Sequence, residues 1–435
     1  MTRFLRPSAL LATAGDIWLV DDLQPVVARL DPADGRLLGL VDASEVPPPP
    51  VPRRPVAAAD DTRLWMQLGD TLVCLDADGV RSTAEVPGLT LLAAGRPGAW
   101  LAEVRTPDIG DPQRGVAAPW PSPGRLVVVT ADGALREVVL DRPPTGEAVA
   151  DDDGLRLQVY LAAPTAIPHR GGYGLDYHET TVRLTWDALR HPRVAVGEHE
   201  RVPLDAGPSQ LYRLDVDEPG WRIGERTWRA GRIDAGPRHD PEVVAAGAEG
   251  DTEVLRVPLG RGVVLSGAPL HGWLWLLVAR RDPGGGRAHE VVAVDPDTGA
   301  VTTVLGRDAV DITGHGWEPP PTPAPGAAAH ARRWLEHLSD LDHHWRGTDG
   351  DPGSPLAAGL SGARAELVGS WPDQAVQVTF RHPWYPAGLL RRRLTLFDEL
   401  GRPLDLEYCD IHLMEDLDTR DLPPPSEAVN GVLSV

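Results

Sequence analysis

The chain has 435 residues, a hydrophobic fraction of 42% and a formal net charge of −21. This length and composition provide a large core and argue against global disorder, while the negative balance disfavours binding to nucleic-acid phosphates. All 42 basic residues are arginine, which excludes a Schiff-base lysine and a phosphate-loop lysine.

The first residues do not form a convincing export signal. Arg3 and Arg6 precede the apolar run 9–14, which is too short for a secretory signal, and Gly15 already opens the first repeat. The sequence has no span of about 18 apolar residues, so we predict no membrane helix. Because a secretory signal is not predicted, we expect a cytoplasmic protein. Cys74 and Cys409 are the only cysteines, so we expect buried apolar thiols and no metal cluster.

A repeated pattern pairs an aromatic and aliphatic strand with a later strand that ends in an Asp-containing turn. It occurs at 15–35, 64–79, 99–133 and 273–299. The chain has 14 Trp against 6 Tyr and 3 Phe, as expected if each repeat places one large ring in the same packing slot. Asp-Gly and related turns separate the strands, as tight hairpins require.

The spacing of these turns predicts a β-propeller. Four-stranded blades take about 40 to 50 residues, so six units fit between residues 8 and 316, and seven is the alternative. The middle, about residues 146 to 262, repeats poorly, and we interpret it as two diverged blades with long loops. Radial packing buries both faces of each sheet.

Two segments resemble known propeller families. The residues Gly15-Asp16-Ile17-Trp18 and Val27 to Gly35 resemble the repeat of streptogramin-lyase-like and surface-layer-type propellers. Ala293, Asp295, Thr298 and Gly299 resemble the docking motif of quinoprotein-like propellers, which would place Trp where this chain has Thr303. The resemblance implies a fold and does not imply a reaction.

The C-terminal part reads as a separate domain. We expect a propeller over 1–316, a Pro-rich linker over 317–326 and a small α+β domain over 327–435 with a loose tail. A helix is predicted over 327–346, followed by antiparallel strands. Its apolar stripe consists of Ala331, Trp334, Leu335, Leu338 and Leu341.

The densest polar and aromatic stretch lies in the diverged middle. We take six of its residues as ligand-contact candidates: His169, Tyr173, Asp176, Tyr177, His178 and Glu179. The alternative is a long loop that bonds only locally. His191, His199 and Glu200 follow, but their spacing is not that of a zinc protease, so we expect no metal and no cofactor.

Two short stretches of the C-terminal domain could meet a protein partner. The partner-contact candidates are His382, Trp384, Tyr385, Glu415, Asp416 and Asp418. An aromatic corner that packs a turn and a solvated acidic patch are the simpler interpretations.

The leading functional hypothesis is a non-catalytic acidic interaction module, in which an immunity-like protein neutralises a basic partner. No Gly-x-Ser-x-Gly nucleophile elbow occurs. The alternative is a metal-dependent lyase or hydrolase acting on a small molecule at the propeller channel. In that case His178 with Glu179, or His199 with Glu200, would supply the base. No catalytic residue is assigned.

Overall fold

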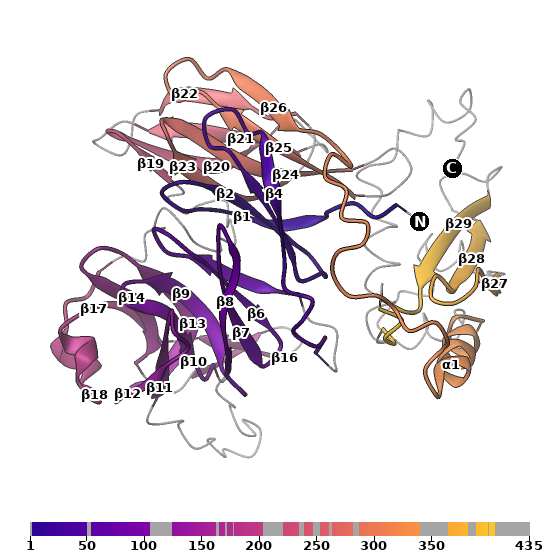
Figure 1. Ribbon diagram of the computed structural model, residues 1–435, viewed down its shortest axis with the longest axis horizontal. Helices are drawn as coiled ribbons and strands as arrows, with labels where there is room; N and C mark the ends of the chain where they lie inside the picture. Colours follow the sequence, from indigo (N-terminus) through magenta and orange to yellow (C-terminus); the bar gives the residue numbers. More distant parts are fainter. Residues whose placement is uncertain are drawn as a thin grey trace. The chain divides into compact units, whose positions relative to one another are not determined.

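The computed structural model describes residues 2–49, 54–104, 124–161, 165–169, 172–176, 178–202, 221–234, 239–246, 253–260, 263–281, 287–339, 364–381, 389–398 and 400–404. The chain divides into two compact units (Figure 1). The first unit comprises Met1–Pro49, Arg53–Asp234 and His239–Gly316, and the second comprises Pro50–Pro52, Ala235–Arg238 and Trp317–Val435.

Three antiparallel sheets follow one another in the first part of unit one. The first contains β1 (Pro7–Ala12), β2 (Ile17–Asp21), β3 (Val26–Leu30) and β4 (Leu37–Asp42). The second contains β5 (Val56–Ala59), β6 (Leu64–Leu68), β7 (Thr71–Asp76) and β8 (Gly79–Glu85). The third contains β9 (Thr90–Gly95), β10 (Gly98–Ala102), β11 (Gly124–Thr130) and β12 (Leu135–Leu140), with the short β18 (Arg193–Val194) added beside β12.

Three further sheets complete unit one among the described residues. The fourth contains β13 (Pro144–Ala150), β14 (Gly154–Tyr160) and β17 (Glu179–Thr185), with the hairpin β15 (Thr165–His169) and β16 (Gly172–Asp176) inserted between β14 and β17. Two 3-10 turns follow, η1 (Ala188–Arg190) and η2 (Val196–Glu198). The fifth contains β19 (Trp221–Ile223), β20 (Arg226–Asp234), β21 (His239–Ala246) and β22 (Glu253–Pro258). The sixth contains β23 (Val263–Leu270), β24 (Trp273–Arg281), β25 (Arg287–Val294) and β26 (Val301–Leu305).

The six sheets share one register between their first two strands. In each sheet, one residue of the second strand lies opposite a residue of the first strand seven positions earlier in the chain. The pairs are Leu11 with Trp18, Ala58 with Trp65, Ala93 with Trp100, Val149 with Arg156, Trp221 with Trp228, and Ala268 with Trp275. The expected common slot for a large ring is therefore confirmed in five sheets, where these second-strand tryptophans are buried. The fourth sheet places Arg156 there.

Successive sheets pack against each other through apolar side chains. Shared cores join the second sheet to the third, the third to the fourth, the fifth to the sixth, and the sixth to the first. The innermost strands β1, β5, β9 and β13 contact one another in that order, and β23 contacts both β1 and β19. This arrangement is an all-β, multi-bladed propeller, as the repeats predict.

The segment after the sixth sheet returns to the N-terminus. The Leu5 amide donates to the Val310 carbonyl at 2.9 Å, and the Ile312 amide donates to the Arg3 carbonyl at 2.9 Å. These hydrogen bonds tie the end of the repeat region to its beginning, since β1 starts only two residues after Leu5.

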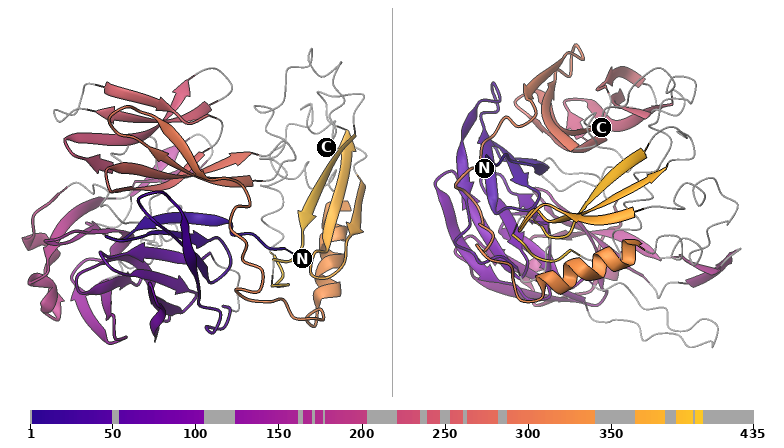
Figure 2. Two further views of the ribbon diagram at one scale, coloured as in Figure 1. Left: turned by 45° about the horizontal axis from the view of Figure 1, so that its top comes forward. Right: turned by 90° about the vertical axis from the view of Figure 1, so that its right-hand side faces the viewer.

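The second unit contains one helix and one sheet among its described residues. The helix α1 (Ala327–Ser339) lies beside the antiparallel sheet of β27 (Arg364–Val368), β28 (Ala375–Arg381) and β29 (Leu389–Thr395) (Figure 2). Ala331, Trp334 and Leu338 of the predicted stripe are buried in a core with strand residues. Leu335 packs beside that core, and Leu341 lies outside the described residues.

The diverged middle of the propeller corresponds to the fourth and fifth sheets. The stretch His169 to Glu179, expected as a loop, is instead partly a hairpin. Its strands β15 and β16 pair antiparallel as a separate sheet, and in the chain they lie between β14 and β17 of the fourth sheet. Across the described residues, no helix is long and apolar enough to cross a membrane.

Candidate functional site

The ligand-contact candidates lie at and beside the inserted hairpin. His169 ends β15, while Tyr173 and Asp176 belong to β16; their side chains lie outside the described structure, as does Tyr177 entirely. His178 is exposed and Glu179, the first residue of β17, is half-buried. The Leu161 amide donates to the His178 carbonyl at 2.7 Å, which closes the base of the insertion.

The other histidines of the middle region lie near the short 3-10 turns. His191 is exposed directly after η1, and His199 is half-buried after η2, next to the exposed Glu200. Within the described residues, no group of three or more His, Cys, Asp or Glu side chains could hold a metal ion. Burial raises the pKa of the Cys74 thiol to about 12, so this cysteine is an unreactive apolar residue.

The six partner-contact candidates of the C-terminal domain, His382, Trp384, Tyr385, Glu415, Asp416 and Asp418, all lie outside the described residues, as does Cys409. Their placement therefore stays a prediction.

One end of the propeller sheets is rich in aspartate. The hairpin between the first and second strands and the turn between the third and fourth strands meet at the same end, because the strands alternate in direction. All six hairpins have only two residues in the turn, with the flanking pairs 13 and 16, 60 and 63, 95 and 98, 151 and 154, 223 and 226, and 270 and 273. Short turns of this kind have a defined backbone conformation.

In the turns between the third and fourth strands, the first aspartate accepts a hydrogen bond from a backbone amide of the same turn. Asp31 accepts a hydrogen bond from the Ala33 amide at 2.9 Å, and Asp76 accepts one from the Asp78 amide at 2.9 Å. Asp295 accepts from the Asp297 amide at 2.8 Å, and this bond holds the pKa of Asp295 below its usual value. These carboxylates therefore shape the turns.

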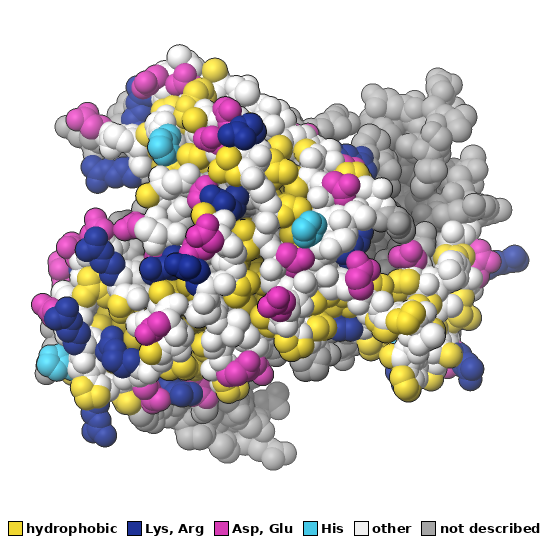
Figure 3. Space-filling model, in the orientation of Figure 1, with side chains coloured by type: hydrophobic (Ala, Val, Ile, Leu, Met, Phe, Trp, Pro, Cys, Tyr) yellow, Lys and Arg dark blue, Asp and Glu magenta, His cyan; other side chains and the backbone are white. Residues whose placement is uncertain are grey.

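A second set of carboxylates in the same turns points outward. We call it the Asp-turn surface, and its exposed members are Asp34, Asp61, Asp78, Asp152, Asp153 and Asp297. Arg226 Nη1 lies 3.9 Å from Asp297 Oδ1, and the Asp297 side chain is 89% exposed, so this ion pair is weak. On the face of unit one that Figure 3 shows, acidic and arginine side chains are interspersed.

At the same end of the sheets, polar side chains accept hydrogen bonds from the tryptophans of the common slot. The Trp18 indole Nε1 donates to Thr13 Oγ1 at 3.3 Å, and the Trp65 Nε1 donates to Asp60 Oδ2 at 3.0 Å. In each case the acceptor precedes the tryptophan by five residues. In the fourth sheet the residue at that position is Asp151, and it forms an ion pair with Arg156.

Asp151 organises a half-buried charge cluster in the fourth sheet. Its Oδ2 lies 3.3 Å from Arg156 Nε and 3.6 Å from Arg183 Nη2. Its Oδ1 accepts hydrogen bonds from the amides of Asp153 and Gly154, both at 3.0 Å. Arg156 is only 9% exposed, so Asp151 supplies a counter-charge for a buried guanidinium.

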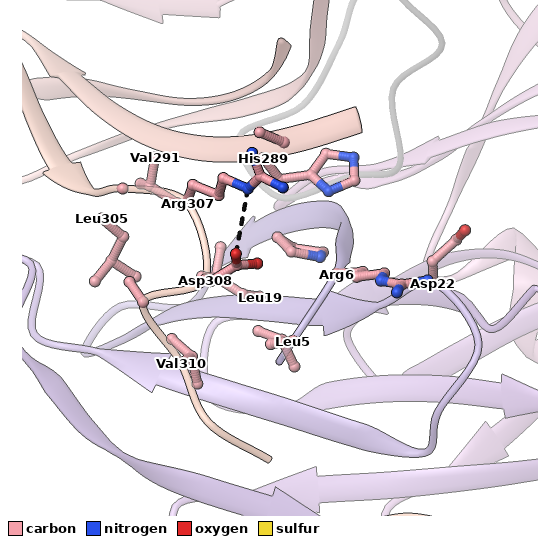
Figure 4. Close-up of a pocket in the computed structure, with 14 residues that line it drawn as sticks. Leu5, Arg6, Leu19, Asp22, His289, Val291, Leu305, Arg307, Asp308 and Val310 are labelled. Atoms are coloured by element: carbon pink, nitrogen blue, oxygen red, sulfur yellow. Dashed lines mark hydrogen bonds and ion pairs between the residues drawn. The ribbon is translucent and has the colours of Figure 1, made fainter. Parts of the chain in front are cut away.

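The opposite end of the propeller sheets carries a cavity of about 400 Å³ between the first and sixth sheets (Figure 4). Its lining residues are Leu5, Arg6, Pro7, Leu19, Asp22, Ala288, His289, Val291, Leu305, Gly306, Arg307, Asp308, Ala309 and Val310. Arg6 and Asp22 come from the first sheet and its flanks, and His289 comes from β25. Arg307 and Asp308 follow β26 and form an ion pair of 3.2 Å.

The sequence offered no signal for this cavity. Arg6 and Arg307 stand at opposite ends of the repeat region, and His289 sits in a strand whose neighbours read as ordinary repeat residues. The packing of the sixth sheet against the first and the return of the segment around Val310 to Leu5 bring them together.

No family model matches the chain, and no curated protein matches it. Among solved structures it is similar to hydrazine synthase of Kuenenia stuttgartiensis, with 12% identity over 68% of this chain and 78% of that chain and a TM-score of 0.31. It is also similar to a protein of unknown function from Bacteroides caccae (13% identity, 67% and 94% of the two chains, TM-score 0.33). The corresponding values for AztD of Citrobacter koseri are 9% identity, 70%, 87% and a TM-score of 0.35. These similarities say nothing about the activity of this chain.

Proposed function

We propose that the six sheets are the blades of a six-bladed propeller that acts as a non-catalytic binding module, and that its Asp-turn surface binds a basic protein partner. The observation that carries this proposal is the division of labour within the turns. Asp76 and Asp295 bond to their own turns, whereas Asp78 and Asp297 face solvent.

Preorganisation favours this use of the turns. A carboxylate on a two-residue hairpin loses little freedom when it binds, so less ordering entropy opposes association. The outward carboxylates Asp61 and Asp152 both stand in such hairpins. On a chain of net charge −21, they also attract a basic protein over a distance of about the Debye length, ~10 Å at 0.1 M salt.

The second unit would add a further surface to this module. Its candidate contacts, including Trp384 and Asp416, and a cytoplasmic location both belong to this proposal. An immunity-like role, in which the module neutralises a basic partner, is the specific form that the acidic charge favours.

Affinity capture from the native host tests the proposal. The bait proteins are the wild type and a variant that carries Asp61→Asn, Asp78→Asn, Asp152→Asn and Asp297→Asn. A control variant carries Glu85→Gln, Glu137→Gln, Glu147→Gln and Glu318→Gln, which removes four exposed carboxylates outside the Asp turns.

The expected result is one basic protein, identified by mass spectrometry, that the wild type and the control retain and the Asp-turn variant loses. Its retention should weaken as salt is raised. Equal retention by the Asp-turn variant, or recovery of only a small metabolite, would contradict the proposal.

The competing class is a metal-dependent lyase or hydrolase at the channel. Metal analysis of the purified protein addresses it directly. One stoichiometric divalent ion that is lost in His178→Ala would favour the enzyme over the binding module.

A further inference from the structure

We propose that the Asp-turn surface continues into an apolar rim, and that its protein partner is amphipathic, with large apolar side chains between its basic ones. This inference deepens the proposed function and rests on it. The rim consists of exposed apolar residues within the first two positions of four fourth strands, β4, β8, β12 and β26: Leu37, Leu38, Val80, Leu135 and Val301.

The rim contains most of the large apolar side chains that the described part of the chain exposes. Seven such residues are exposed there, and five of them belong to the rim. The other two are Val263, which begins the first strand of the sixth sheet, and Leu367 in the second unit. A single exposed apolar residue is normal, but the return of one at the same place in four sheets calls for an explanation.

Four rim residues share one strand register. Each lies opposite the last residue before the turn that joins the third strand to the fourth. The pairs are Leu37 with Leu30, Val80 with Leu75, Leu135 with Val129, and Val301 with Val294. The four opposite residues are all buried. Because opposite residues of antiparallel strands lie on the same face, the apolar face of each sheet extends from the core to the surface beside the turn.

Hydrogen bonds between neighbouring sheets bring the rim and the turns together. Arg29 Nη1 of β3 donates to the Ala77 carbonyl at 3.0 Å, in the turn of the second sheet. Ser82 Oγ of β8 donates to the Ala131 carbonyl at 2.9 Å, in the turn of the third sheet. The turn of each sheet therefore rests on the outer strands of the sheet before it.

The turn of the first sheet rests on the sixth sheet in the same way. Gly35 lies so close to Val304 of β26 that a Cβ at this position would collide with it. The exposed Asp34 precedes this glycine, and the rim residue Val301 begins β26. Rim residues and outward carboxylates therefore follow one another along the sixth, first, second and third sheets.

Two arginines beside the rim already pair with the first aspartate of their own turn. Arg36 Nη2 lies 3.5 Å from Asp31 Oδ2, and Arg81 Nε lies 2.5 Å from Asp76 Oδ2. Asp78, the second aspartate of its turn, forms no ion pair with any residue that the structure describes. A basic side chain of the partner would pair with such outward carboxylates while its apolar neighbours cover the rim.

The rim changes how binding should respond to salt. Ion pairs between exposed groups weaken as salt is raised, whereas the burial of apolar surface does not depend on unscreened charge. A purely basic segment should therefore dissociate at high salt, and an amphipathic basic segment should retain part of its affinity.

Fluorescence anisotropy with the full chain and two labelled peptides tests the inference. One peptide alternates leucine with arginine, and the other alternates serine with arginine at the same length and charge. We expect both to bind at about 0.1 M salt. At about 0.5 M salt, the leucine–arginine peptide should bind at least about tenfold more tightly than the serine–arginine peptide.

A rim variant locates the apolar contact. It carries Leu37→Gln, Val80→Gln, Leu135→Gln and Val301→Gln, and it should weaken binding of the leucine–arginine peptide by about tenfold without changing that of the serine–arginine peptide. Thermal midpoints show whether each variant folds.

Val80→Gln with Leu135→Gln repeats the test with two changes, in case the full rim variant does not fold, and should weaken binding about two- to threefold. Its matched control is Val263→Gln with Leu367→Gln, which changes two exposed apolar residues outside the rim and should leave both affinities as they are.

The Asp-turn variant separates this inference from the proposed function, because it should weaken binding of both peptides. If it does so while the two peptides bind equally well at high salt, or while the rim variants bind like the wild type, the apolar rim is wrong and the proposed function stands. If the Asp-turn variant binds both peptides as tightly as the wild type does, the proposed function fails and the inference fails with it.

Discussion

In both the second and the fourth sheets, an aspartate before the first hairpin pairs with the side chain five residues later, but that side chain differs. Both have a two-residue hairpin preceded by aspartate, Asp60 in one and Asp151 in the other. In the second sheet the group five residues later is the indole of Trp65, and in the fourth it is the guanidinium of Arg156. The strand register is the same in both sheets.

The two sheets therefore share the two-residue hairpin and the strand register, whereas the tryptophan can be replaced. An aspartate at this position bonds to the hairpin amides and still has one oxygen for whatever occupies the slot. Asp60 accepts from the Thr62 and Arg63 amides as well as from the indole. A neutral ring and a charged guanidinium therefore fit the same backbone.

Three other sheets lack a polar residue at this position. Their slot tryptophans have a buried Nε1 without a hydrogen-bond partner among the described residues: Trp100, Trp228 and Trp275. The corresponding positions, five residues earlier, hold Gly95, Ile223 and Leu270. Because a buried donor without an acceptor costs free energy, these sheets are expected to be weaker at this end than the first and second.

Removal of Asp151 should give the largest effect. Asp151→Ala removes a carboxylate that pairs with the buried Arg156, which is expected to cost about 3 kcal/mol of unfolding free energy. Urea titration followed by tryptophan fluorescence measures it. Asp152→Ala, at the exposed neighbouring position, is the control and should change stability by less than about 0.5 kcal/mol. Similar losses in both variants would show that Arg156 does not depend on this ion pair.

Removal of Asp60 should cost less, because the group that loses its acceptor is neutral. Asp60→Ala leaves the Trp65 Nε1 without an acceptor and is expected to lose about 1–2 kcal/mol in the same titration. Asp60→Asn retains an oxygen acceptor and should lose less. A loss as large as that of Asp151→Ala would contradict the proposed difference between the two sheets.

The fifth sheet allows the missing acceptor to be added. Ile223→Thr places a hydroxyl where Thr13 stands in the first sheet, and Ile223→Val has the same shape without the hydroxyl. The Thr variant is expected to exceed the Val variant by about 1 kcal/mol in unfolding free energy, since only Thr can accept from Trp228 Nε1. Equal stabilities would show that the indole does not use the hydroxyl.

The smallest expected effect concerns acid. The Asp297 amide holds the pKa of Asp295 below the ordinary value of 3.8, so the folded state binds fewer protons than the unfolded state near that pH. The stabilisation is present above the unfolded pKa and is lost as pH falls through the lower folded pKa. Asp295→Asn should therefore flatten the acid limb of the stability curve relative to wild type, and Asp297→Asn should not. A limb that Asp295→Asn leaves unchanged would show that this turn bond is not the cause.

The sequence predicts the repeat where it keeps its tryptophan and its Asp turn together. Trp18 and Trp65 reveal the first two sheets, because the apolar strands around them are unbroken. The fourth sheet is hidden for two physical reasons. Arg156 replaces the ring, and the hairpin of β15 and β16 separates strands that pair directly, β14 and β17.

The hydrogen bond of the slot tryptophan could not be predicted, because its acceptor is a hydroxyl in one sheet and a carboxylate in another. Thr13 and Asp60 do the same work, yet no composition rule links a hydroxyl to a carboxylate five residues before a tryptophan. The cavity could not be predicted either, because Arg6 and Arg307 line one space only once the sixth sheet packs against the first. The ligand candidates around His169 stay predictions.

Hydrogen–deuterium exchange on the complex with the captured partner tests the central claim most directly. The claim is that the outward carboxylates of the Asp turns form the binding surface. We predict slower exchange on binding in peptides that contain Asp61, Asp78, Asp152 and Asp297, with no change around Arg6 and Arg307. Protection confined to the cavity end, or to the second unit alone, would contradict the account.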